Sequence, residues 1–278
     1  MISVIIPTYN RGSFLQEAIS SVLAQDYFSG RKPGHDWELL IIDDGSDDGT
    51  RDVVRAFGDR VQYLCQEHRG VSAARNAGLG LARGTFIAYL DSDDLWKKEK
   101  LRLQMEFMAA HAEAMACCTE EIWIRHGRRH NPMKKHQKHS GWIFDKVVPL
   151  CLLSLSSALF RRTVFEEIGN FDEDLPACED YDLGLRLAQK TPIYFLKEPL
   201  IIKRGGHPDQ LSRQFWGMDR FRVRALEKAL SLSLSPAQER LVRAEIIKKS
   251  RILLAGFLKR GNQEEIRKYQ AIIEKYEL

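Results

Sequence analysis

The first hundred residues alternate between continuous apolar runs and segments whose apolar residues recur at helical spacing. The apolar runs are Ile2–Ile6, Glu38–Ile42, Val61–Leu64 and Thr85–Leu90. Short strands that alternate with helices predict an α/β fold with a parallel sheet.

Turn residues mark the start of the first two helices in this region. One helix follows the turn at 10–13, and another begins at 71–74 after Gly70. The first helix is expected to carry four apolar residues on one face: Phe14, Ala18, Val22 and Leu23.

After residue 94 the pattern becomes mixed. We predict a helix over Lys98–Ala110, a strand over Met115–Ile124, a helix from Glu179 through Leu187, an extended segment over Pro192–Ile202, and helices from about Phe215, one of them starting at Pro236 after Ser235. The basic stretch Arg125–His139 holds four histidines at irregular spacing: His126, His130, His136 and His139. This irregularity favours a solvated surface loop over a zinc site.

Composition sets only broad limits. The 278 residues are 44% hydrophobic, which is ample for a substantial core. The net charge of +4 is too small to indicate a nucleic-acid-binding protein. The five cysteines form no Cys-x-x-Cys pair, and their odd number fits a reducing cytoplasm better than a disulfide framework. The longest apolar stretch, Val147–Phe160, is too short to span a bilayer.

Three polar segments follow predicted strands and contain the candidate functional residues. They are Thr8-Tyr9-Asn10, Asp43-Asp44 and Asp91-Ser92-Asp93-Asp94. In parallel α/β sheets ligands collect beyond the carboxyl ends of the strands, where these segments would converge. Clustered carboxylates repel one another unless a cation or proton neutralises them, and a hard divalent ion is the usual neutraliser. The pattern therefore indicates metal and diphosphate chemistry.

Simpler explanations exist for each acidic segment. The stretch 43–50 has the composition of a turn followed by a helix cap, and Asp91–Asp94 could cap the helix that follows, although a cap employs one carboxylate and not three. The acidic start of the helix at Glu179 is also what the helix macrodipole favours.

Five motifs occur in order along the chain: Val4-Ile5-Ile6-Pro7-Thr8-Tyr9-Asn10, Ile41-Ile42-Asp43-Asp44-Gly45-Ser46-x-Asp48-x-Thr50, Ala73-Ala74-Arg75-Asn76-x-Gly78, Tyr89-Leu90-Asp91-Ser92-Asp93-Asp94 and Glu179-Asp180-Tyr181-Asp182-Leu183. Taken together, these motifs resemble those of the inverting glycosyltransferases of family 2. Each is weak alone, but together they span about two-thirds of the chain. The resemblance implies the GT-A fold, a Rossmann-like and mostly parallel sheet flanked by helices.

The resemblance also implies residue roles. Substrate-binding residues would be Pro7, Thr8, Tyr9, Asn10, Asp43, Asp44, Arg75, Asp91, Ser92, Glu179 and His207. Among these, Pro7, Thr8, Tyr9 and Asp43 would hold the nucleobase. Arg75 would contact the nucleotide or diphosphate, because a guanidinium donates several hydrogen bonds to anionic oxygens; a surface arginine is the alternative. Asp93, with Asp91 beside it, would bind Mn²⁺ or Mg²⁺.

Inversion needs a base that removes the acceptor proton as the new bond forms. Asp180 is the expected base, with Glu179 and Asp182 as alternatives that should point elsewhere in a helix. The family's Arg-x-His-x-x-Ser segment is altered to Arg204–Ser212 with an additional glycine, so His207 is either a metal or diphosphate ligand or a structural residue. The Gln-x-x-Arg-Trp signature of processive relatives is absent.

The sequence therefore predicts a non-processive hexosyltransferase that moves one sugar from a nucleotide diphosphosugar, expected to be a UDP-sugar, to a saccharide or lipid-linked saccharide in envelope or exopolysaccharide synthesis. We expect a catalytic domain at 1–214, with a nucleotide-sugar-binding half at 1–94 and an acceptor half at 95–214, and a helical C-terminal extension at 215–278. A non-catalytic carbohydrate- or nucleotide-binding protein and a sugar-nucleotide pyrophosphorylase are the alternatives; the second lacks its glycine-rich, basic triphosphate loop.

The C-terminal tail is basic. Residues 219–278 contain fourteen Lys or Arg and eight Asp or Glu. Apolar residues lie among the basic ones: Ile246, Ile247, Leu253, Leu254 and Phe257. This composition suits an anionic membrane surface, and a solvated helical cap is the alternative. We therefore expect a cytoplasmic protein with peripheral contact at the inner face of the cell membrane.

Overall fold

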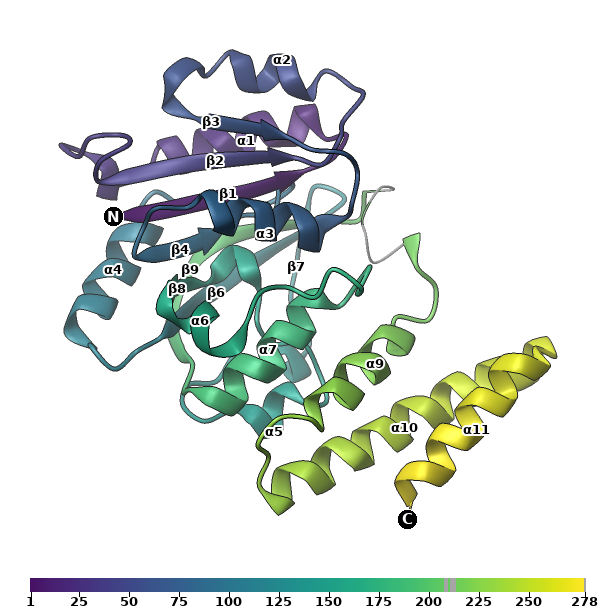
Figure 1. Ribbon diagram of the computed structural model, residues 1–278. Coiled ribbons are helices and arrows are strands. Elements are labelled where there is room, and N and C mark those ends of the chain that lie inside the picture. Colours follow the sequence, from purple (N-terminus) through teal and green to yellow (C-terminus); the bar gives the residue numbers. More distant parts are fainter. Residues whose placement is uncertain (208–209, 211–213, 278) are drawn as a thin grey trace.

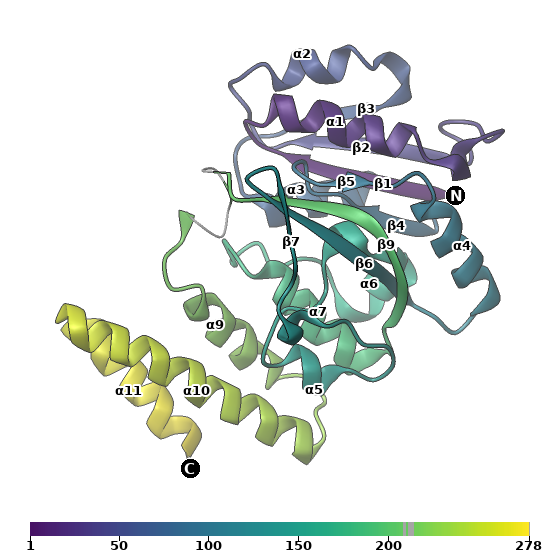
Figure 2. The same ribbon diagram turned by 180° about the vertical axis from the view of Figure 1, so that it is seen from behind.

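The computed structural model describes residues 1–277 apart from 208–209 and 211–213. Helices cover both faces of a central sheet, and a helical tail packs at one end (Figure 1; Figure 2 shows the same arrangement from behind). The predicted fold class is confirmed.

The strands of the described residues form one nine-stranded sheet. Their bounds are β1 Ile2–Thr8, β2 Trp37–Asp43, β3 Gln62–Cys65, β4 Phe86–Tyr89, β5 Leu95–Trp96, β6 Ala116–Arg125, β7 Arg128–His130, β8 Leu159–Arg161 and β9 Tyr194–Gly205. The order is β3-β2-β1-β4-β8-β6-β9-β5, and β7 pairs with β6. The first four strands are parallel, as their alternation with helices predicted. In the second half β8 is antiparallel to β4 and β6, whereas β6 and β9 are parallel.

The helices connect these strands and form the tail. Their bounds are α1 Gly12–Leu23, α2 Thr50–Arg55, α3 Val71–Leu81, α4 Lys100–Ala110, α5 Phe144–Val147, α6 Thr163–Ile168, α7 Glu179–Lys190, α9 Asp219–Ala229, α10 Pro236–Arg260 and α11 Gln263–Glu277. None of the helices formed by the described residues combines the length and the hydropathy that crossing a bilayer requires.

Strands β1 and β2 at the centre of the parallel half are buried on both faces. Val4 and Ile6 of β1 belong to the core that includes α1, whereas Ile5 belongs to the core on the opposite face, with α3 and α7. Helix α3 lies especially close to the sheet, because a β-carbon at Gly78 would be 2.5 Å from Cγ2 of Ile5. The glycine of the third motif is therefore needed for this contact.

The face predicted for α1 is partly wrong. Phe14 and Leu23 are only half-buried, and Leu15 and Ile19 complete the buried face with the correctly predicted alanine and valine. The ring of Phe14 instead contacts Arg204, whose guanidinium carbon lies 4.9 Å from the ring centroid.

The predicted surface loop at 125–139 is wrong in its first part. Arg125 and Arg128 pair across a tight turn between β6 and β7. The two turn residues, His126 and Gly127, have φ of 48° and 71°, as a type I′ hairpin turn requires. The exposed His-Gly dipeptide at 126–127 was the feature of the sequence that could have predicted this turn. Further on, residues 137–140 line a cavity of about 530 Å³ with side chains of β9.

The helical tail is confirmed, and it contains α11 in addition to the predicted helices. Ser235 caps α10: its hydroxyl accepts from the N–H of Gln238 at 3.3 Å, and the Gln238 side chain accepts from the N–H of Ser235 at 2.8 Å. Tail residues such as Val223, Ile246 and Phe257 belong to the same core as α3 and α7. The domain boundary at 214/215 therefore stays a prediction.

Candidate active site

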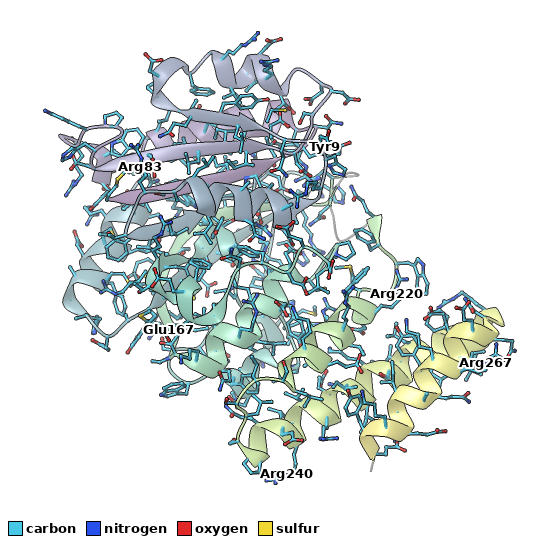
Figure 3. The ribbon with its side chains drawn as sticks, in the orientation of Figure 1. Tyr9, Arg83, Glu167, Arg220, Arg240 and Arg267 are labelled. Atoms are coloured by element: carbon cyan, nitrogen blue, oxygen red, sulfur yellow. The ribbon has the colours of Figure 1, made fainter. Side chains whose placement is uncertain are left out.

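The carboxyl ends of β1, β2 and β4 meet at one edge of the sheet. Thr8 lies opposite Asp43, and its carbonyl accepts a hydrogen bond from the N–H of Asp44 at 2.9 Å. Because β4 pairs with the other side of β1, residues 91–94 emerge at the same edge. Figure 3 shows Tyr9 where the arrowheads of β1 and β2 end. We call this edge the rim.

An exposed aromatic pair lies on the rim. Tyr9 is 43% exposed and stacks on His68, with ring centroids 4.1 Å apart. Nδ1 of His68 lies 2.8 Å from the carboxylate of Asp44. That carboxylate also fastens the rest of the loop, accepting from the Gln66 side chain at 2.7 Å and from the N–H groups of Arg69 at 3.0 Å and Gly70 at 2.7 Å. Asp44 thus fixes the aromatic pair, and His68, which no motif contains, was missed in the sequence.

Asp43, next to Asp44 in the chain, is fully buried. One of its oxygens accepts the N–H of Ser46 at 2.9 Å, and the other accepts the hydroxyl of Tyr63 at 2.5 Å. Burial and the neighbouring carboxylate raise the pKa of Tyr63 far above its usual value. Asn10, with φ of 50°, donates its N–H to the Ser46 hydroxyl at 2.8 Å and so ties the first and second motifs together. Pro7, Thr8 and Ser92 are buried.

Arg75 is a buried ionic link and not a surface arginine. Its guanidinium lies 2.5 Å from Glu179 and 2.8 Å from Asp91, and it is 4% exposed. Its positive charge holds the pKa of Asp91 below the usual range, although burial acts in the opposite direction. The link joins α3, the segment after β4 and the start of α7. Contact of Arg75 with a diphosphate stays a prediction.

Replacing Arg75 with glutamine should lower the free energy of unfolding by about 3 kcal/mol, because the buried Glu179 and the half-buried Asp91 then lose their cation. Urea denaturation followed by circular dichroism measures the change. Arg55→Gln is the control, since Arg55 and Asp52 form an ion pair whose side chains are 67% and 82% exposed; a change of about 0–1 kcal/mol is expected there. Equal losses in the two variants would contradict the buried link.

Asp93 is held from two sides. Its Oδ2 lies 2.8 Å from Nη1 of Arg11 and 2.8 Å from Nε2 of His207. Arg204 stabilises the same segment, because its Nε donates to the carbonyl of Asp93 at 2.5 Å and its N–H to Asp94 at 3.0 Å. The structure therefore brings His207 to the acidic motif across 114 residues. Arg11 was missed because it belongs to no recognised motif. Arg204 begins the altered segment 204–212, but no role was inferred for it from the sequence, and Ser212 of that segment lies outside the described residues.

The three acidic residues at the start of α7 point to different partners. Glu179 binds Arg75, and burial raises its pKa. Asp182 lies 2.7 Å from Arg186 and 2.9 Å from Lys228. Asp180 is half-buried and, among the described residues, forms no ion pair within 4 Å. Its Oδ1 accepts the N–H of the next residue at 2.7 Å. As predicted, the three side chains point in different directions. The carboxylate of Asp180 is therefore available for a chemical role.

Lys203 of β9 lies among the acidic groups and was not recognised in the sequence. Burial disfavours its charged form, yet four nearby carboxylates raise its pKa well above the usual value: Glu121, Asp94, Asp91 and Asp180. The pKa of Asp94 is itself raised by burial and by the adjacent Asp93. A lysine that stays cationic thus balances the negative charge between the acidic motif and α7.

The rim offers two protein ligands for a divalent ion. Among the described residues no three His, Cys, Asp or Glu side chains are grouped to hold a metal. The carboxylate of Asp93 and the imidazole of His207 nevertheless approach to 2.8 Å. Mg²⁺ is commonly held by one or two protein ligands together with substrate phosphates and water. The residues therefore fit an ion whose coordination is completed by a bound diphosphate.

Comparison with solved structures identifies the class of fold. The chain is similar to residues 1–349 of S. aureus TarS in complex with UDP-GlcNAc, with a TM-score of 0.77 and 20% identity over 99% of this chain and 80% of that one. It is also similar to a mannosyltransferase from Pyrobaculum calidifontis in complex with GDP-Man and Mn²⁺, with a TM-score of 0.65 and 19% identity over 99% of this chain and 83% of that one. The chain thus has the fold of these proteins, whose structures hold nucleotide sugars.

Sequence similarity then gives the family. Residues 3–169 match Glycosyl transferase family 2, and the chain belongs to this family. It is 44% identical over 195 residues to the Escherichia coli UDP-Glc:α-D-GlcNAc-diphosphoundecaprenol β-1,3-glucosyltransferase WfgD, over 69% of this chain and 72% of WfgD. It is 30% identical over 209 residues to an uncharacterized glycosyltransferase of Rickettsia prowazekii, over 73% of this chain and 64% of that protein's length.

Proposed function

We propose that this chain is an inverting, metal-dependent enzyme that transfers one hexose from a UDP-sugar to a saccharide carried on a lipid diphosphate. The name of WfgD states a UDP-sugar donor and a diphosphoundecaprenol-linked acceptor, and TarS was crystallised with UDP-GlcNAc. Assembly of an envelope polysaccharide or exopolysaccharide at the inner face of the cell membrane is the setting that this chemistry supports.

The observation that carries the proposal is the position of Arg75. The same guanidinium binds Asp91 of the acidic motif and Glu179, the neighbour of Asp180. Asp91, which we propose to hold the donor, and Glu179, which precedes the proposed base, are therefore both bound to one buried guanidinium. Single displacement at an anomeric carbon needs this kind of fixed relation between donor and base.

The donor would be held by the rim. Tyr9 and His68 offer a stacking surface for the nucleobase. Asp43 is 0% exposed and already accepts from Ser46 and Tyr63, so its contact with a uracil imide stays a prediction. Asp91 would receive the ribose. Asp93 and His207 would hold Mn²⁺ or Mg²⁺, which would stabilise negative charge on the departing nucleoside diphosphate. The mannosyltransferase with Mn²⁺ in its structure supports the choice of ion.

Asp180 would act as the general base. Its carboxylate takes the proton of the acceptor hydroxyl while that oxygen forms a bond to the anomeric carbon, and the bond from this carbon to the nucleoside diphosphate breaks on the opposite side. One displacement inverts the configuration. Glu179 would position the helix start through Arg75, and Lys203 would balance the charge of the surrounding carboxylates.

A screen of nucleotide sugars by thermal shift tests the donor. In the presence of Mn²⁺, a UDP-sugar at 100 times its dissociation constant should add about 2.7 kcal/mol of apparent stability. Tyr9→Ala should weaken this binding by about 1–3 kcal/mol, the usual value of a base stacked on an aromatic ring. Trp142→Ala is the matched control, because Trp142 is 67% exposed and lies outside the rim.

The same samples should be assayed for transfer to a lipid-diphosphate saccharide. Product formation with inverted configuration supports the enzyme. UDP-sugar binding without any turnover would instead identify a non-catalytic binding protein, and stabilisation by GDP-sugars alone would contradict the proposed donor.

A further inference from the structure

Helix α10 carries a basic stripe on its exposed face. The stripe consists of six exposed residues spaced three or four apart: Arg240, Ala244, Lys248, Arg251, Ala255 and Lys259. This spacing keeps their side chains on one side of the helix, over about 28 Å. The two acidic residues of α10 lie off the stripe, since Glu239 is half-buried and Glu245 is 7% exposed.

Two exposed apolar side chains flank the basic stripe. Ile252 and Leu258 are each 57% exposed. The apolar residues that the sequence suggested for a membrane contact are mostly in the core instead, with Ile246 0%, Leu253 5% and Phe257 1% exposed. The prediction that these apolar residues contact a membrane is therefore wrong, because they face the core of the protein.

Surface ion pairs neutralise the stripe only weakly. Arg251 lies 2.5 Å from Glu277, and Lys248 lies 3.2 Å from Glu245, but the side chains of Arg251 and Lys248 are 64% and 63% exposed. The Arg251–Glu277 pair is exposed on both sides, and such a pair contributes little and can be exchanged for other anions. Glu245 is buried and also lies 3.0 Å from Lys249, so its single charge is shared between two lysines and does not cancel that of Lys248. The four cations of the stripe are therefore available to a surface of opposite charge.

We propose that the basic stripe docks α10 on the anionic surface of a lipid bilayer, with Ile252 and Leu258 at the boundary of the acyl chains. Long basic side chains reach headgroup phosphates while their stems cover apolar surface. A soluble acidic polysaccharide offers the same charge complementarity, but it gives no apolar phase for Ile252 and Leu258. The bilayer is a partner in addition to the substrates of the proposed function. Docking itself does not depend on that function; only its purpose, to bring the enzyme to a lipid-linked acceptor, rests on it.

Sedimentation with acceptor-free vesicles of phosphatidylglycerol and phosphatidylcholine tests the docking on the full chain. Four substitutions remove the charge of the stripe: Arg240→Gln, Lys248→Gln, Arg251→Gln and Lys259→Gln. Because each basic residue contributes about a fivefold factor at such a surface, we expect the partition coefficient to fall by several hundred-fold. The double substitution Ile252→Gln and Leu258→Gln should lower the partition coefficient about tenfold. This loss should be easier to measure at high salt, where the contribution of the charges is screened.

The matched control removes the same charge elsewhere. Arg128, Arg129, Lys134 and Lys135 are exposed in the β7 region, and their replacement by glutamine gives the same net charge as the stripe variant. This control should bind vesicles like the unaltered protein. Deleting the tail after Ser235 is unsuitable, because it would remove Val242, Ile246 and Phe257 from the core.

Equal loss in the stripe variant and its control would overturn the proposal, since it would show attraction by net charge alone. Unchanged vesicle binding by the Ile252 and Leu258 variant, with equal binding to a soluble acidic polysaccharide, would assign the stripe to that polymer instead. Unfolding curves establish that the variants are folded. The vesicles contain neither donor nor acceptor, so the result is independent of the proposed function, which transfer to a water-soluble acceptor analogue tests separately.

Discussion

Asp180→Asn should lower kcat by about 10²–10⁴-fold and leave the affinity for the UDP-sugar within about twofold of its original value. Asparagine keeps the size of the side chain and its hydrogen bond to the next N–H, but it cannot take a proton from the acceptor. Isothermal titration calorimetry with the donor and a transfer assay under saturating donor measure the two quantities on the same preparation.

Asp174→Asn is the control for this substitution, because the Asp174 side chain is 84% exposed, lies 3.7 Å from Arg224 of α9 and is assigned no part in binding or catalysis; its kcat should not change. Turnover of the Asp180 variant within tenfold of the original would remove the base role from Asp180. The two alternatives would then face a physical obstacle, since Glu179 is bound to Arg75 and Asp182 to Arg186.

The rim could be predicted from sequence because its parts are local. Each motif is a strand followed by polar residues, and parallel strands bring their carboxyl ends to one edge whatever the details of packing. This is why the fold class and the convergence of Thr8, Asp43 and Asp91 follow from the pattern. Roles within the rim do not follow, because Asp43 and Arg75 turn out to be buried and already bound to protein groups.

Two residues that approach the site from outside the five motifs, Lys203 and His68, could not be predicted. Lys203 sits in β9, and its approach to the acidic motif depends on the register of β9 with β6, including a bulge near Glu120. His68 depends on the loop that Asp44 fastens. Such contacts arise from tertiary packing and leave no periodic signal in the chain.

In the helical tail, by contrast, the mixture of apolar and basic residues was visible in the sequence, but it fitted both a membrane surface and a helix packed on the core. Helix α10 mixes apolar and basic residues along its length, and its buried face holds Glu245, Lys249 and Ser250 as well as apolar side chains. Only packing decides which of the apolar residues are covered, and here the core covers Ile246 and Phe257. The basic stripe remains as the exposed part, with a smaller apolar contribution than the sequence suggested.

Asp93→Ala should abolish stimulation by Mn²⁺ and lower metal-dependent turnover by on the order of 10²–10³-fold, since a bound divalent ion supplies several kcal/mol of charge stabilisation to a departing diphosphate. Binding of UDP should weaken in the presence of Mn²⁺ and change little in its absence. A titration of activity with Mn²⁺, together with calorimetry of UDP with and without the ion, measures these effects.

Two comparisons make the Asp93 result specific. Asp47→Ala removes an exposed carboxylate from the same rim and should leave the Mn²⁺ response unchanged. Asp93→Asn keeps the size of the side chain, which limits disturbance of Arg11 and His207, and should lose the Mn²⁺ response as the alanine variant does, because a neutral amide is a much weaker ligand for a hard cation. If both Asp93 variants keep the original activity across the metal titration, the pair formed by Asp93 and His207 is a structural contact, and the metal-dependent part of the proposed function falls with it.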